Sequence, residues 1–373
     1  MRRNSAIRGG DGEGEEGGEK EGEKCALHGG RGCGRAIAAG REKDFPLDEI
    51  AVLGDEKTHP MSLTKSLLCI VALALSSAAQ SLAAAETGRG QTARVDDIRI
   101  KRDLVYGHAG GRALKLDLFL PPGDGPKPLI IWIHGGAWLQ GSKDGPSPAR
   151  QFTGSGYAVA QIGYRLSQAA KWPAQIHDCK AAVRWLRANA ALYHLDPQRF
   201  AAWGGSAGGQ LVAMLGTSGG VAELEGESND VKASSRVQAV VDWFGPSDFL
   251  QMDKAGSSMK HDAPNSPESQ LIGGAIQENK DAAAKANPIT YIGRGDAPPP
   301  FLIMHGEKDT TVPFNQSELL RDALQAAHAD VTFRPVPGAG HGFRGEENIA
   351  PVREFLARVL APASGAKDSP VKP

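Results

Sequence analysis

A serine surrounded by glycines has the pattern of a nucleophile. The run GGSAGG at residues 204–209 follows an apolar segment, residues 200–203, and precedes a stretch with helical character. In a tight turn between a strand and a helix, glycines two residues before and after the serine leave room for the chain. The hydroxyl is then exposed at the N-terminus of a helix, which stabilises negative charge. This spacing predicts that Ser206 is a nucleophile.

A second run predicts an oxyanion site. HGGAW at residues 134–138 ends another apolar segment, residues 128–133. Adjacent glycines leave backbone N–H groups uncovered, so the amides of Gly135 and Gly136 are expected to face a developing oxyanion together with the amide of Ala207. The alternative is a plain Gly-Gly turn.

An acid and a base follow later in the chain. HGEKDTTVP at residues 305–313 contains two carboxylates, of which Asp309 is preferred to Glu307 because it falls in the turn before Val312-Pro313. Surface roles for both are the alternative. GAGHGF at residues 338–343 places His341 on an accessible glycine-rich loop. We predict that His341 is the general base and that Asp309 orients it.

Eight segments with strand patterns and four with helical patterns must position these groups. Residues 95–105 and 114–120 alternate polar and apolar side chains and predict two antiparallel strands. Residues 128–134, 157–163, 200–203, 237–243, 301–304 and 331–336 are short apolar runs typical of buried parallel strands, and residues 173–192, 206–215, 315–327 and 347–360 predict helices. The alternation predicts an α/β fold with a mostly parallel eight-stranded sheet and helices on both faces.

Two polar insertions interrupt this pattern. Residues 218–235 and 251–287 are too long for simple turns. The second is expected to form either a small lid over the site or a solvated insertion.

The N-terminal part of the chain differs from the rest. Residues 1–60 are rich in Gly and charged residues and predict disorder. Residues 61–85 have the basic start, apolar centre and small-residue cleavage site of a signal peptide, with a membrane anchor as the alternative. Because the apolar part is shorter than the roughly 20 residues that cross a bilayer, we expect no stable membrane span. The simplest expectation is a true start at Met61, cleavage after Ala85, and a secreted or periplasmic domain of residues 86–373. The alternative is a long pre-region that is translated and removed.

The composition excludes one class of partner. The 373 residues include 42 Lys and Arg against 43 Asp and Glu, a formal net charge of -1. A nucleic-acid partner would require a basic face, so none is expected. The absence of Cys and His runs with zinc-like spacing predicts no metal, and no organic cofactor is implied.

The motifs together resemble the esterase and lipase branch of the α/β-hydrolase fold. The resemblance covers about residues 95–362, and it also rests on YRL at 164–166, DCKAAVRW at 178–185 and DWFGPSD at 242–248. It is greatest to the carboxylesterase and feruloyl-esterase-like group, which borders the hormone-sensitive-lipase-like esterases. Ala137 stands where the latter often have a third glycine, and no long N-terminal cap precedes the first strand, so the former group is favoured.

The resemblance implies a serine esterase that forms an acyl-enzyme on a small-molecule or oligosaccharide ester, with acetyl or feruloyl esters of plant polysaccharide as candidates. The same triad serves amide, formamide and peptide hydrolysis, which is the alternative activity. A non-catalytic binding protein with this fold is a further alternative, although such proteins typically lack a member of the triad.

Overall fold

The computed structural model describes residues 97–227 and 231–362 of the chain. The predicted disordered segment, residues 1–60, and the predicted signal peptide, residues 61–85, lie outside these residues. Among the described helices, none has the length and apolar character needed to cross a membrane.

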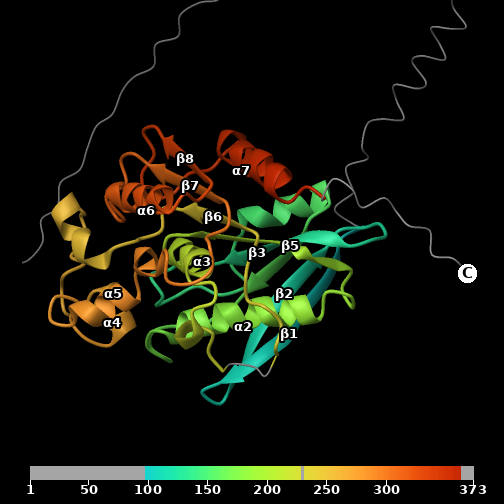
Figure 1. The fold of residues 1–373 in the computed structure, drawn as a ribbon, viewed down its shortest axis with the longest axis horizontal. Helices are drawn as coiled ribbons and strands as arrows, with labels where there is room; N and C mark the ends of the chain where they lie inside the picture. The colour runs from blue at the N-terminus through green and yellow to red at the C-terminus, as the bar shows by residue number, and fades with distance from the viewer. Residues whose placement is uncertain (1–96, 228–230, 363–373) are drawn as a thin grey trace, which may run out of the picture. The chain divides into compact units, whose positions relative to one another are not determined.

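Eight strands form a single mixed sheet (Figure 1). They are β1 (Arg99–Ala109), β2 (Arg112–Leu120), β3 (Lys127–Ile133), β4 (Ala158–Ile162), β5 (Leu195–Gly205), β6 (Ala239–Trp243), β7 (Phe301–Gly306) and β8 (Val331–Val336). Their order across the sheet is β1-β2-β4-β3-β5-β6-β7-β8. β2 pairs antiparallel with both β1 and β4, and all pairs from β4 to β8 are parallel. The predicted fold class is confirmed.

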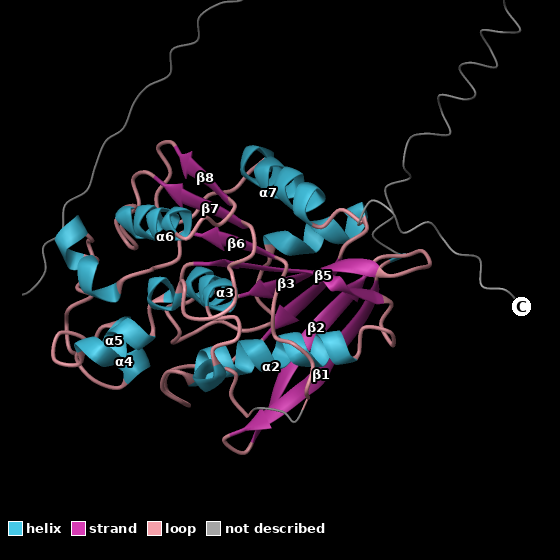
Figure 2. Ribbon diagram, in the orientation of Figure 1, coloured by secondary structure: helices cyan, strands magenta, loops and turns pink. Residues whose placement is uncertain are grey.

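Helices cover both faces of the sheet (Figure 2), because alternate residues of each central strand point to opposite sides. Leu129, Ile131 and Ile133 of β3 pack into one core with α2 (Ala174–Ala188), α3 (Ala207–Thr217) and α6 (Asn315–Ala326). Ile130 and Trp132 pack into a second core with α7 (Glu346–Val359) and the 3₁₀ helix η2 (Pro148–Ser155). Burial on both faces is why these strands lack polar alternation.

The insertion at residues 251–287 packs against the body of the domain. It contains α4 (Pro267–Ile272) and α5 (Lys280–Lys285), and Leu271, Ile276 and Ala283 within it are fully buried. Backbone carbonyls of the insertion accept hydrogen bonds from side chains outside it, including 3.0 Å from Trp172 Nε1 to Lys285 O. The insertion is therefore docked rather than merely solvated.

The parallel strands bring the predicted site together. β5, β7 and β8 all run in the same direction, so the loops after them emerge at one edge of the sheet. Sites in open α/β sheets lie at this carboxyl edge. Ser206 follows β5, Asp309 follows β7 and His341 follows β8.

Candidate active site

Ser206 stands in a strained turn between β5 and α3. Its backbone has φ 58° and ψ −125°, a region that residues other than glycine rarely adopt. A Cβ atom on Gly204 would lie 2.3 Å from Gly208 O, and one on Gly208 would lie 2.2 Å from Ile133 O. Both glycines are therefore required by close packing, as the spacing around Ser206 predicts.

His341 contacts both of the other predicted residues. Its Nε2 atom lies 2.9 Å from Ser206 Oγ, and its Nδ1 atom lies 2.7 Å from Asp309 Oδ2. Because the carboxylate only accepts, Nδ1–H is the donor to Asp309, and Nε2 is left to accept from the serine hydroxyl. The structure thus brings three residues that are distant in the sequence into one hydrogen-bonded row.

Asp309 is buried and surrounded by donors. Its Oδ1 accepts from the backbone amides of Thr311 and Val312 at 2.8 and 3.0 Å. Burial alone would raise the pKa of Asp309, but hydrogen bonds from His305 and His341 hold this pKa well below its usual range. The carboxylate is therefore ionised at neutral pH. Glu307, the alternative acid, is exposed.

His305 is a member of the site that the sequence reasoning missed. Its side chain is fully buried, and its Nε2 atom lies 3.2 Å from Asp309 Oδ2 and 2.9 Å from Val312 O. The carbonyl only accepts, so Nε2 carries a proton, and Nδ1 accepts from the Ser317 hydroxyl at 2.7 Å. A histidine four residues before Asp309 was the available signal.

The predicted oxyanion loop packs directly against the turn that holds Ser206. A Cβ atom on Gly135 would lie 2.7 Å from Gly205 O and 3.4 Å from Ser206 Cβ, so this approach requires a glycine. Gly135 and Gly136 line the same pocket as Ser206. Ala207 is the first residue of α3, and its amide has no acceptor within the helix. The three predicted amide donors thus belong to segments beside the serine.

Side-chain hydrogen bonds hold the loop that contains Gly135 and Gly136 in place. The Tyr164 hydroxyl donates to His134 O at 3.0 Å, and its ring stacks on the His134 ring with centroids 4.3 Å apart. Trp138 Nε1 donates to Gln210 Oε1 at 3.1 Å. Since Gln210 lies on α3, the loop and the helix behind Ser206 are held together.

The pocket that contains Ser206 and His341 has a volume of about 870 Å³. Much of its wall is apolar or aromatic, and it includes Trp132, Trp243, Phe244, Phe343 and Ile349. No residue of the 251–287 insertion lines this pocket among the residues described, so the lid expectation is not supported.

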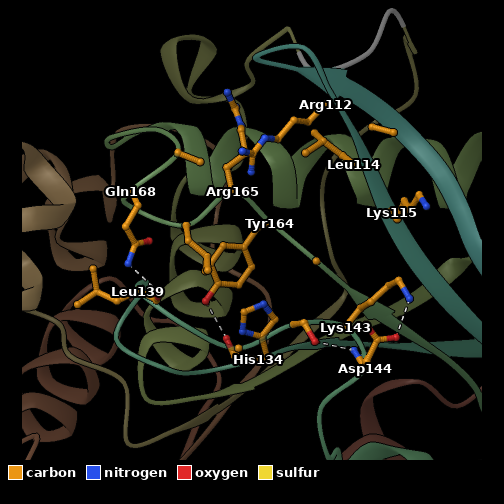
Figure 3. Close-up of a pocket in the computed structure, with 16 residues that line it drawn as sticks. Arg112, Leu114, Lys115, His134, Leu139, Lys143, Asp144, Tyr164, Arg165 and Gln168 are labelled. Carbon is orange, nitrogen blue, oxygen red and sulfur yellow. Dashed lines mark hydrogen bonds and ion pairs between the residues drawn. The ribbon is translucent and has the colours of Figure 1, made fainter.

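A second hollow has a volume of about 610 Å³ and is shown in Figure 3. It borders the loop that contains Gly135 and Gly136, but Ser206 does not line it. Lys143 and Arg165 line it, and each is paired with an acid. Lys143 Nζ lies 3.0 Å from Asp117 Oδ1, and Arg165 Nη2 lies 2.7 Å from Asp178 Oδ1. Two of the main basic groups of this hollow are therefore already neutralised.

The described residues contain no group of three or more His, Cys, Asp or Glu side chains that could hold a metal ion. At the site, the protein supplies the Ser206 hydroxyl, the His341 imidazole, the Asp309 carboxylate and the nearby amides.

The fold and the site together define an α/β-hydrolase fold with a Ser-His-Asp arrangement, in the chain order Ser, Asp, His. The chain belongs to the BD-FAE family, whose model matches residues 116–324.

Curated relatives share the same part of the chain. The probable carboxylic ester hydrolase LipM of Mycobacterium tuberculosis is 32% identical over 71% of this chain and 64% of its own length. Esterase LipC of the same organism is 31% identical over 58% of this chain and 53% of its own length. The chain therefore spans less than two thirds of these relatives.

Solved structures of esterases have the same fold. A truncated carbohydrate esterase from gut microbiota is 31% identical, with a TM-score of 0.63, and the match covers 73% of this chain and 99% of that one. A bifunctional GH43-CE protein of Bacteroides eggerthii is 38% identical with a TM-score of 0.63, over 70% of this chain and 38% of that one. Esterase 2 of Thermogutta terrifontis is 27% identical with a TM-score of 0.58, over 76% and 100%.

Proposed function

We propose that this protein is a serine esterase that hydrolyses carboxylic esters through an acyl-enzyme. The observation that carries the proposal is the row of hydrogen bonds from Ser206 Oγ to His341 Nε2 and from His341 Nδ1 to Asp309 Oδ2. A serine hydroxyl is a weak nucleophile until an adjacent base accepts its proton, and this geometry supplies that base.

In the first half of the reaction, Ser206 Oγ attacks the acyl carbon and His341 Nε2 takes the hydroxyl proton. The carbonyl oxygen becomes an oxyanion, which the amides of Gly135, Gly136 and Ala207 hold. When the tetrahedral intermediate collapses, the bond to the alcohol breaks, and the alcohol leaves with the proton from His341. The acyl group remains on Ser206.

In the second half, His341 takes a proton from water as the water attacks the acyl carbon. Collapse of the second intermediate returns that proton to Ser206 Oγ and releases the acid. Asp309 remains ionised throughout, fixes the His341 tautomer and stabilises the imidazolium that forms twice in each cycle. The four donors around its carboxylate support this role.

The substrates proposed are esters on carbohydrate, such as the acetyl or feruloyl esters of plant polysaccharide. Two of the similar structures are named as a carbohydrate esterase and a GH43-CE protein, which supports this class. The aromatic side chains that line the pocket also suit an aromatic acyl group. Hydrolysis of acetylated and feruloylated oligosaccharides should exceed that of peptide and formamide substrates, and the reverse order would favour the amidase alternative.

The test of the proposed chemistry is the variant Ser206→Ala. It should abolish turnover of 4-nitrophenyl acetate, and a fluorophosphonate probe that labels the wild-type protein at Ser206 should no longer react. The thermal melt should remain near that of the wild type, which separates chemistry from folding. Turnover by the variant near the wild-type rate would refute the assignment.

We also propose that the domain is exported, with residues 61–85 as its signal peptide. N-terminal sequencing of protein recovered outside the cytoplasm should begin near Glu86. A peptide from residues 10–24 in the expressed precursor would contradict a start at Met61.

A further inference from the structure

The pocket around Ser206 carries an excess of positive charge. Among its described lining residues, Arg150 and Arg344 are charged at neutral pH, and none is Asp or Glu. Arg150 lies on η2, shortly after the loop that contains Gly135 and Gly136. Arg344 lies three residues after His341. The two guanidinium groups therefore come from segments that follow two different parts of the catalytic machinery.

Neither arginine is neutralised within the part of the chain that the structure describes. No ion pair involves Arg150 or Arg344, whereas the neighbouring Arg353 pairs with Glu346. Arg150 lies 5.7 Å from the centroid of the Phe119 ring, a contact that leaves its N–H donors available. Both side chains are exposed to solvent. A negatively charged ligand can therefore reach them without displacing an acid.

Two further donors in the pocket wall lack an acceptor. The Nε1 atoms of Trp132 and Trp243 are buried, and neither has a hydrogen-bond partner among the described residues. Both tryptophans line the pocket. Because these N–H groups are buried, the exposed guanidinium groups of Arg150 and Arg344 are the charged donors that a ligand can reach.

The acids around the pocket are paired with other groups. The Asp309 carboxylate accepts from His305, His341 and two backbone amides. Glu346 is paired with Arg353, and Glu347 accepts from Asn348 Nδ2 at 3.3 Å. Glu347 also lies beside Gly345, where a Cβ atom would be 2.2 Å from its Oε1 atom. It forms no ion pair with Arg344 in the described structure.

We propose that this pocket selects esters that carry an ionised carboxylate in addition to the ester group, and that Arg150 and Arg344 bind this carboxylate. The inference rests on the proposed esterase function and names a narrower substrate class for it. A guanidinium binds a carboxylate through two parallel hydrogen bonds, which orients the ester as well as attracting it. The carboxylate belongs to either the acyl half or the alcohol half of the ester, and matched probes distinguish the two.

The experiment compares two pairs of esters that differ in charge. In the first pair, 4-acetoxybenzoate carries the carboxylate in its alcohol half, and phenyl acetate is its neutral partner. In the second pair, the 4-nitrophenyl monoester of glutarate carries the carboxylate in its acyl half, and 4-nitrophenyl butyrate is its neutral partner. The measured quantity is the ratio of kcat/KM for the charged ester to that for its neutral partner. In Arg150→Gln/Arg344→Gln, this ratio should fall about five-fold or more for one pair, and added salt should lower it in the wild type.

Arg112→Gln is the matched control. It removes one positive charge from the hollow in Figure 3, which does not contain Ser206, and the ratio should stay at the wild-type value. Ratios in the double variant within two-fold of the wild type for both pairs would overturn the proposal.

A binding measurement separates this proposal from the esterase function. By calorimetry, Ser206→Ala should bind 4-acetoxybenzoate or glutarate more tightly than Ser206→Ala/Arg150→Gln/Arg344→Gln. Equal binding of both ligands by the two proteins would overturn the anion site whether or not any ester is turned over. If the wild type hydrolyses none of the four esters, the esterase function itself would be contradicted.

Discussion

The Nε2 atom of His305 lies 3.2 Å from Oδ2 of Asp309, the same oxygen that accepts from His341. The carboxylate thus lies between two histidines, one fully buried and one facing the pocket. Because Nε2 of His305 also donates to Val312 O, its proton is fixed in place. His305 thereby orients the acid that orients the base.

Replacement of His305 should slow catalysis by loosening Asp309. We expect His305→Leu to lower kcat for 4-nitrophenyl acetate about ten-fold, the loss expected for one hydrogen bond to a charged group, with a smaller effect on KM. The pKa of Asp309 should also rise towards its ordinary value, because one of the hydrogen bonds that lower it is lost.

His305→Gln is the matched variant, because its amide can still donate to Asp309 Oδ2. It should retain most of the kcat that His305→Leu loses, while thermal melts report any general damage to the fold. Equal losses of kcat in the two variants would show that the donor is unimportant and that His305 only fills space.

Much of the fold follows from local apolar patterns. β8 (Val331–Val336) coincides with the predicted segment because polar or turn residues bound it on both sides. β5 was predicted over residues 200–203, yet it begins at Leu195, where a register shift against β3 accommodates polar residues. That extension depends on pairing with a distant strand and has no signal in the local pattern.

The remaining differences have a similar origin. α4 and α5 are six residues each, too short for a helical period to be recognised. Within that insertion, His261 Nδ1 pairs with Glu268 at 3.0 Å in a buried position, a contact that depends on tertiary packing. The three residues of the proposed triad were recognisable because each lies in a glycine-rich or turn motif. His305 lies in the same run as Asp309, near the end of β7 (Phe301–Gly306), but its role depends on its burial and on its contacts with Asp309 and Val312, which the local pattern does not give.

Gly208 should tolerate no side chain. A Cβ atom there would lie 2.2 Å from Ile133 O, so Gly208→Ala must move either α3 or β3. We expect a loss of about 3 kcal/mol in the free energy of unfolding, measured by urea denaturation, together with loss of esterase activity. Gly154→Ala is the control, because nothing lies within 4 Å of its Cβ position, and it should change stability by less than about 0.5 kcal/mol. Similar stabilities for the two variants would contradict the packing described.

Asp242 should make the fold less stable as the pH rises. Burial raises the pKa of this carboxyl from 3.8 to about 6, against the opposing effects of the Gly245 amide and His305, and its Oδ2 atom has no partner among the described residues. A raised pKa means that the folded state favours the protonated form. The stabilisation is complete below pH 3.8 and is lost as the pH rises through about 6.

Asp242→Asn removes this titration and should therefore flatten the profile. Relative to the wild type, the variant should gain about 1.4 kcal/mol of unfolding free energy between pH 5 and pH 8. This is about half of the full value of the pKa shift, because the other half is lost below pH 5. The measurement is urea denaturation of both proteins at each pH. A difference between the two proteins that is constant from pH 5 to pH 8 would show that Asp242 does not titrate in this range.

The backbone of Ser206 should store strain that a glycine releases. At φ 58° and ψ −125°, a residue with a Cβ atom costs about 1–3 kcal/mol. Ser206→Gly and Ser206→Ala both remove the hydroxyl that contacts His341, so their difference isolates the Cβ atom. Glycine's greater freedom in the unfolded chain costs about 0.5–1 kcal/mol. We expect Ser206→Gly to be more stable than Ser206→Ala by about 1 kcal/mol in urea denaturation. If the alanine variant is instead more stable than the glycine variant by about 0.5–1 kcal/mol, the turn at Ser206 is not strained.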